Sequence, residues 1–110
     1  MTTTMVRLTG TKYKMEIYAL EGHKVRFVGE NGSESSIESA KTFLKIGEIY
    51  TVDHTEVGQS YTAVHLKEVP PNSKGYPMSF NSVMFEDVEP QSEADTRRHP
   101  NYYFYHEPAI

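Results

Sequence analysis

Two alternating segments joined by a short polar turn constrain the fold of this chain more than any other feature. Residues 48–56 and 61–68 each alternate apolar with polar side chains, and Gly58 and Gln59 lie between them. A period of two is typical of a strand with one buried face, and a short glycine-containing connection joins neighbouring antiparallel strands. The pattern predicts a β-hairpin in which one face of the first strand carries Tyr50, Val52 and His54.

Two earlier segments also have strand patterns. Residues 23–29 place Val25 and Phe27 on one face, and an Asn-Gly pair at residues 31–32 follows them. Asn-Gly readily adopts the positive backbone angles of a tight turn, so it marks the end of this strand. Residues 5–20 alternate as well. We therefore expect a strand over residues 23–29 and an added N-terminal strand or hairpin before it.

A short helix or an ordered loop is predicted between the Asn-Gly turn and the hairpin. Ser35 is followed three residues later by Glu38, which resembles a capping box at a helix start. A weak stripe at helical spacing supports one or two turns of helix, and it comprises Ile37, Ala40, Lys41 and Leu44.

The chain after the hairpin contains a break and then three short elements. Pro70 and Pro71 interrupt the sheet because proline cannot donate a backbone hydrogen bond to a strand ladder. Beyond this loop, the sequence predicts a short strand at residues 78–80, a single helical turn at 81–84 and a closing strand at 85–88.

The order of these pieces resembles that of SH3-like barrels. In such domains a Gly-Glu pair, here Gly47 and Glu48, opens a strand, an aromatic-bearing strand such as residues 61–64 follows, and a short strand, one 3₁₀ turn and a last strand close the barrel. The chain is also similar to small SH3-like proteins encoded by phages, prophages and mobile elements. The resemblance implies an all-β, SH3-like barrel over residues 23–89.

Two extensions flank the expected barrel. Residues 1–22 would form the N-terminal strand or hairpin, and residues 90–110 a C-terminal arm. The arm starts polar and then becomes aromatic, with four successive rings that solvent accommodates poorly. We expect these rings to dock onto the barrel, onto a second copy or onto a target, and they are Tyr102, Tyr103, Phe104 and Tyr105.

Composition excludes several classes of protein. The 110 residues suit one domain, and the absence of cysteine removes disulfides, thiolate metal ligands and cysteine nucleophiles. A formal charge of −4 argues against a broad electrostatic grip on phosphate backbones. No apolar run is long enough to span a bilayer, and the start of the chain lacks the pattern of a secretory signal. The expected location is the cytoplasm, which for a phage-encoded protein is that of the host.

Candidate catalytic and metal-ligating residues do not converge in the sequence. Five histidines are present, but only His54 and His65, on the two strands of the hairpin, are expected to approach each other, and no third ligand is evident. Glu86 and Asp87 are neighbours in a strand and so point to opposite sides. Motifs of hydrolases, phosphate-binding loops and zinc proteases are missing. We therefore expect a non-enzymatic protein without a metal or cofactor.

Protein association is the leading functional prediction. The peptide groove of SH3 domains uses a tryptophan, which this chain lacks, so recognition of proline-rich helices is not favoured. An unpaired first strand and the aromatic arm offer backbone and ring contacts to a protein partner or a second copy. Eight residues are predicted to bind protein: four at positions that correspond roughly to the SH3 peptide groove, and four in the arm. They are Tyr61, Tyr76, Phe80, Met84, Tyr102, Tyr103, Phe104 and Tyr105.

Two alternatives remain open at this point. A nucleic-acid-binding barrel would use aromatic stacking beside a small basic stripe, whose members are Lys12, Lys14, Lys24 and Arg26. A small ligand or nucleotide held between protomers is the second alternative.

Overall fold

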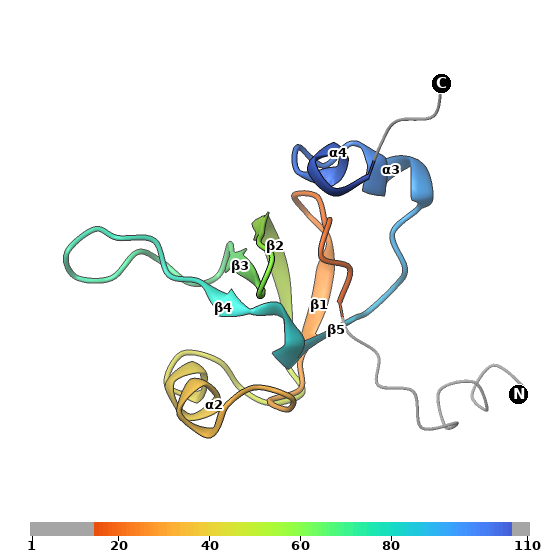
Figure 1. The fold of residues 1–110 in the computed structure, drawn as a ribbon. Coiled ribbons are helices and arrows are strands. Elements are labelled where there is room, and N and C mark those ends of the chain that lie inside the picture. Colours follow the sequence, from red (N-terminus) through yellow and green to blue (C-terminus); the bar gives the residue numbers. More distant parts are fainter. Residues whose placement is uncertain (1–14, 107–110) are drawn as a thin grey trace, which may run out of the picture.

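The computed structural model describes residues 15–106, and its centre is a five-stranded antiparallel sheet with the strand order β4-β3-β2-β1-β5 (Figure 1). Short helices lie at the two ends of the sheet, so the protein is mostly β, whereas the sequence suggested an all-β chain. The strands are β1 (Lys24–Phe27), β2 (Ile49–Val57), β3 (Thr62–Leu66), β4 (Phe80–Asn81) and β5 (Phe85–Asp87). The helices are α2 (Glu34–Lys41), the 3₁₀ turn η1 (Ser82–Met84), α3 (Glu93–Arg97) and α4 (Tyr102–Tyr105).

The sheet is strongly curled. Strands β4 and β5 occupy its two opposite edges, although only the single turn η1 separates them along the chain. Chain continuity therefore brings the two edges towards each other. Among residues 15–106, however, no backbone ladder pairs β4 with β5, so strand pairing does not close the expected barrel.

The predicted hairpin is confirmed, but its register contains an irregularity. Strands β2 and β3 pair antiparallel, and a β-bulge lies between Val52 and His54. A bulge adds one residue to a strand and moves the following side chains to the other face. Tyr50 and Val52 are buried as expected, whereas His54 lies on the exposed side and Thr55 takes the next buried position. The prediction that His54 shares a face with Tyr50 and Val52 was wrong.

The core lies inside the curl of the sheet. Val25 and Phe27 of β1 are fully buried, as the alternation predicted. Their neighbours come from β2, β3, β5 and η1, and the largest fully buried side chains are Phe27, Phe85, Met84, Val25, Val52 and Val64. The rings of Phe27 and Phe85 lie 5.5 Å apart between centroids, so the first and last strands meet through aromatic packing.

The predicted N-terminal strand was wrong where the structure describes it. Residues 15–22 form turns and no strand. Met15, Tyr18 and Ala19 are buried, a spacing of three and four residues that a strand cannot present to one face. Tertiary contacts hold the turns in place, since the Met15 N–H donates to the Phe85 carbonyl at 3.1 Å. The remainder of the predicted strand or hairpin, before residue 15, lies outside the described residues.

A glycine is required where the chain enters β2. Gly47 has a φ of +89°, in the left-handed region that glycine adopts without steric strain. Its N–H donates to the Phe27 carbonyl at 2.7 Å, which ties the turn to the end of β1. Gly47 of the Gly-Glu pair thus lies in a turn that needs a positive φ, which is why glycine is required there.

Helix α2 begins two residues earlier than the capping-box pattern predicted. The N-cap is Ser33, whose hydroxyl accepts a hydrogen bond from the Ser36 N–H at 3.2 Å. Ala40 and Leu44 of the predicted stripe are buried and Ile37 packs against the core, whereas Lys41 is exposed.

The cap assignment leads to a test by substitution. We expect Ser33→Ala to lower the free energy of unfolding by about 1 kcal/mol, the usual cost of losing a helix N-cap. Ser35→Ala, at the position that the sequence pattern favoured, is the matched control and should change stability by only a few tenths of that amount. Urea denaturation followed by circular dichroism measures both. Equal effects of the two substitutions would contradict the assignment.

Candidate functional site

The C-terminal arm covers an open edge of the sheet. Strand β1 pairs with only the first residues of β2, Ile49–Thr51, so within residues 15–106 the later part of this β2 edge has no strand partner. Polar groups of the arm bind there instead: the Asn101 side-chain oxygen accepts from the Val57 N–H at 3.2 Å, and the Tyr105 hydroxyl donates to the Val57 carbonyl at 3.2 Å. The arm therefore satisfies backbone groups that an uncovered edge would expose.

His99 is the buried anchor of the arm. Its Nδ1 accepts from the Asn101 N–H at 2.9 Å, so the ring proton is carried by Nε2. Nε2 lies 2.7 Å from the Thr55 hydroxyl oxygen and 3.2 Å from the Thr55 carbonyl oxygen. Burial lowers the pKa of His99, and this effect outweighs the hydrogen bond to the Thr55 carbonyl, which raises it. His99 is thus held neutral with one defined tautomer.

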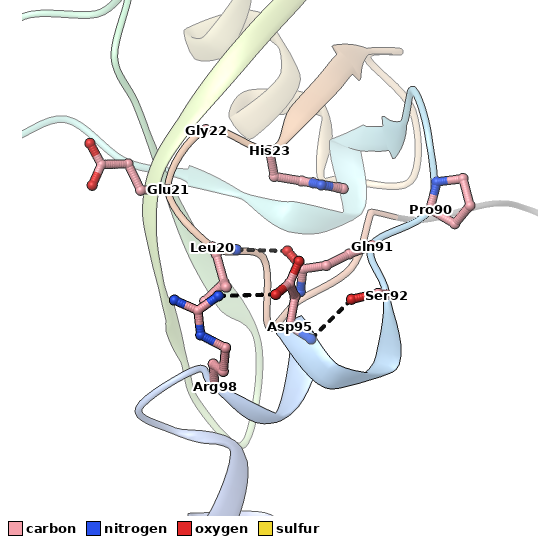
Figure 2. Close-up of a pocket in the computed structure, with 9 residues that line it drawn as sticks. All are labelled: Leu20, Glu21, Gly22, His23, Pro90, Gln91, Ser92, Asp95 and Arg98. Carbon is pink, nitrogen blue, oxygen red and sulfur yellow. Dashed lines mark hydrogen bonds and ion pairs between the residues drawn. The ribbon is translucent and has the colours of Figure 1, made fainter.

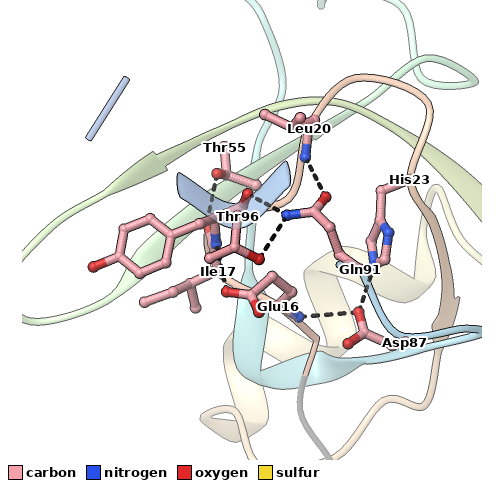
Figure 3. Close-up of polar contacts among 9 residues, drawn as sticks. Glu16, Ile17, Leu20, His23, Thr55, Asp87, Gln91 and Thr96 are labelled. Atoms are coloured by element: carbon pink, nitrogen blue, oxygen red, sulfur yellow. Dashed lines mark hydrogen bonds and ion pairs between the residues drawn. The ribbon is translucent and has the colours of Figure 1, made fainter. Parts of the chain in front are cut away.

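The N-terminal turns are bound to the arm through a polar network (Figure 3). The side chain of Gln91 accepts from the Leu20 N–H at 2.9 Å and donates to the Tyr18 carbonyl at 2.8 Å. The Thr55 hydroxyl, next to His99, donates to the Ile17 carbonyl at 2.6 Å. Residues 15–20 are therefore held between the sheet and the arm.

An aromatic cluster forms the inner side of the arm. The ring of Tyr18 contacts the rings of His99, Tyr102 and His106 edge to face, with centroids 5.1 to 5.6 Å apart. Burial raises the pKa of the Tyr18 hydroxyl, which lies 3.3 Å from His106 Nε2. Tyr102 therefore belongs to the docked side of the predicted aromatic run.

The other three rings of the run face outward. Tyr103, Phe104 and Tyr105 are 48%, 77% and 45% exposed, and we call them the aromatic surface. The Tyr105 hydroxyl is hydrogen-bonded to Val57 at the end of β2, so this surface lies beside the turn that joins β2 to β3. The same turn carries the exposed Tyr61. The docked rings and the polar anchors of the arm hold the aromatic surface in a defined position.

The four residues predicted at positions of the SH3 peptide groove do not form one surface. Tyr61 and Tyr76 are exposed, whereas Phe80 and Met84 are buried core residues. Phe80, Met84 and Phe43 are among the residues that line a cavity of about 330 Å³ between α2 and β4. The structure thus separates the predicted set into core and surface members.

Sequence analysis missed the residues that position the arm. Gln91 and His99 lie in the polar start of the arm, and Asn101 begins its aromatic stretch. The one feature of the sequence that could have indicated their role is a set of side chains able to hydrogen-bond to a strand edge, followed directly by an aromatic run. Hydrogen bonds to residues more than 40 positions away cannot be derived from local spacing.

The described half of the predicted basic stripe lies beside acidic groups. Arg26 forms an ion pair with Glu86 at 2.8 Å, and Lys24 donates to the Thr51 hydroxyl at 2.7 Å. Glu68 is also near: its burial raises its pKa, but hydrogen bonds from the Thr51 N–H and the charge of Lys24 more than offset this and lower it. Lys12 and Lys14 lie outside the described residues, and nucleic-acid binding stays a prediction.

An open polar pocket lies between the N-terminal turns and α3 (Figure 2). Its volume is about 610 Å³, and the residues around it include Glu21, His23, Gln91 and Arg98. The polar groups already have protein partners: His23 lies 2.6 Å from Asp87, Arg98 binds Asp95 at 3.0 Å, and Gln91 holds Leu20. Binding of a small ligand also stays a prediction.

The fold and the arm together define a small, mostly β protein with a curled five-stranded antiparallel sheet and an aromatic arm over its open edge. The family model of bacteriophage T4 protein Y07B matches residues 23–107, and the chain belongs to this family. The match includes both the sheet and the arm. No curated protein and no solved structure matches the chain significantly. None of the helices within residues 15–106 has the length and apolar character needed to cross a membrane.

Proposed function

We propose that this protein is a non-enzymatic accessory protein that acts by binding another protein, either a partner or a second copy, through its aromatic surface. The observation that carries the proposal is the outward position of Tyr103, Phe104 and Tyr105 on an arm whose other side is docked. Large exposed rings are costly in water, and aromatic residues are enriched in the centres of protein interfaces. A ring surface fixed before binding also loses less conformational entropy on association.

The strand order supports an SH3-like architecture for this accessory protein. The order β4-β3-β2-β1-β5, with η1 between the two edge strands, has the sequence of elements that the resemblance to SH3-like barrels implies. We therefore propose an SH3-like barrel that is incompletely closed. Membership of a phage protein family supports a phage origin, with the host cytoplasm as the place of action.

The aromatic surface can be tested by substitution at two exposed rings. We expect the double variant Tyr103→Ser and Phe104→Ser to weaken association at least about 30-fold, because truncating an aromatic hot spot commonly costs about 2 kcal/mol or more of binding free energy. Light scattering coupled to size exclusion measures self-association. Pull-down from phage-infected host cells, followed by affinity measurement on the captured protein, measures partner binding.

The design separates loss of binding from loss of folding. Tyr105 is left intact because its hydroxyl binds β2, and circular dichroism checks that the variant remains folded. Tyr76→Ser is the matched control, since Tyr76 is equally exposed but lies in the connection between β3 and β4. Unchanged mass and unchanged capture by the double variant, or an equal loss in the control, would refute the proposal.

A further inference from the structure

Three side chains with metal-ligating atoms meet on the outer face of the β2–β3 hairpin. His54 and Glu56 lie two positions apart on β2, and His65 pairs directly with His54 across the ladder. Their ligating atoms all lie within 4.8 Å of one another. The two imidazole rings are stacked, with centroids 4.2 Å apart and planes at 10°.

The β-bulge after Val52 creates this arrangement. With regular alternation, His54 would share the inner face with Val52, and Glu56 would follow it there. The extra residue turns both side chains outward, while Thr55 takes the buried position. The third ligand that the sequence did not reveal is therefore Glu56, placed by a feature of strand pairing.

A buried nitrogen without a partner lies at the centre of the cluster. His65 is 9% exposed, and its Nε2 makes no hydrogen bond among the residues that the structure describes. An oxygen of Glu56 lies 3.7 Å from this nitrogen, which is too far for a hydrogen bond. Buried polar groups are nearly always satisfied, so an orphan of this kind calls for a ligand.

The second histidine is oriented for ligation. His54 Nδ1 lies 2.6 Å from a carboxylate oxygen of Asp53, which accepts a hydrogen bond from the Nδ1–H, so the free lone pair of this imidazole is on Nε2. A carboxylate behind the imidazole is the usual outer partner of a metal-bound histidine. His54 Nε2 lies 3.8 Å from the other oxygen of Glu56, so the two oxygens of this carboxylate lie near the Nε2 atoms of the two imidazoles.

We propose that His54 Nε2, His65 Nε2 and the Glu56 carboxylate bind one divalent transition-metal ion of the Zn²⁺ type. Two imidazoles and one carboxylate are a ligand set typical of zinc, with the fourth tetrahedral position open to water. Asp53 and Glu56 together carry the two negative charges that balance the ion. The site lies on the hairpin and does not involve the aromatic surface.

The distances require only a small closure. Ligands around a tetrahedral ion with bonds of about 2.0–2.1 Å lie about 3.3 Å apart, compared with the present separations of 3.7 and 3.8 Å from Glu56 to the two histidines. The near-parallel rings must also open, because each lone pair lies in the plane of its own ring. Both changes are accessible, since the side chains of His54 and Glu56 are largely exposed while His65 stays fixed in the sheet.

The test uses the full-length chain without a histidine tag, stripped of metal by a chelator and titrated with ZnCl₂ in a calorimeter. We expect one ion per chain and a rise in melting temperature on saturation, because ligand binding to the native state alone stabilises it. His54→Ala and Glu56→Gln should each abolish the one-to-one isotherm. Asp53→Asn should weaken binding about 10- to 100-fold, as loss of a carboxylate behind a metal-bound histidine typically does.

Two further measurements keep the result decisive. His106→Asn removes a histidine that is not one of the three proposed ligands and should leave the isotherm unchanged. Nitrogen-15 spectra of the imidazoles should show shifts at Nε2 of His54 and His65 on zinc addition, which needs no substitution and so avoids any effect on folding. Absence of binding by the wild-type chain, binding retained in both His54→Ala and Glu56→Gln, or zinc shifts confined to other histidines would overturn the proposal.

Discussion

Phe27→Ala is expected to lower the free energy of unfolding by about 3–5 kcal/mol, the usual range for truncating a buried phenylalanine. Phe27 has no exposed surface and its ring packs on Phe85, so the substitution leaves a cavity where β1 and β5 meet. Small domains are stable by only about 5–15 kcal/mol, and a large part of that margin would be lost. Urea denaturation followed by circular dichroism measures the change.

The exposed Phe104 provides the control for Phe27. Its ring is 77% exposed, and Phe104→Ala should shift the denaturation midpoint by no more than the equivalent of about 0.5 kcal/mol. The same chemical change thus has a large effect in the core and a small one on the arm. A loss at Phe27 no greater than that at Phe104 would show that the inside of the sheet is not packed as described.

His99→Ala should detach the arm from the sheet. The substitution leaves the Asn101 N–H without its acceptor and the Thr55 carbonyl without its donor, and orphaned buried groups of this kind each cost about 1–3 kcal/mol. We expect a loss of about 2–4 kcal/mol in stability and faster amide hydrogen exchange throughout residues 91–106. Unchanged exchange in the arm would contradict the role of His99 as its anchor.

His99 should also make the stability of the protein depend on pH. Burial lowers the pKa of His99 below its ordinary value of 6.5, so the unfolded chain takes up a proton at a higher pH than the folded chain does. The contribution of neutral His99 to the free energy of unfolding is therefore fully present above pH 6.5, and it decreases as the pH falls from 6.5 towards the lowered pKa. A proton on Nδ1 would also break the hydrogen bond from the Asn101 N–H, because two donors would then face each other.

His99→Gln separates titration from hydrogen bonding. The glutamine amide retains a donor for Thr55 but does not ionise between pH 7.5 and 5.5, so the variant should lose less stability over that interval than the wild type. Thermal melts of both proteins at the two pH values test this. An identical pH dependence would assign the acid sensitivity to other groups.

The elements that sequence analysis predicted correctly are those built from local pattern. Alternation in residues 24–27 and across the β2–β3 hairpin, together with the short run from Phe80 to Asp87, is confirmed as strands and one 3₁₀ turn. In these segments the local preference for a strand or a turn agrees with the tertiary packing, although the bulge interrupts the period of two in β2.

The failures occur where distant contacts override local pattern. Residues 15–20 alternate, but hydrogen bonds with Phe85 and Gln91 hold them as turns. His54 reverses its face because the bulge adds a residue to β2. The anchoring role of the polar residues of the arm was not predicted, because their partners on β2 are remote in the chain. None of these contacts has a signal in residue spacing.

The amino-acid sequence by itself determined a small, cysteine-free, mainly β chain with one dependable hairpin and an aromatic C-terminal segment, since composition and a period of two are local properties. Only the tertiary structure decided that no ladder among the described strands closes the curled sheet, that the arm covers the open edge of β2, and that two histidines and a glutamate meet on one face. These outcomes depend on strand order and register, which arise from long-range packing and backbone hydrogen bonding.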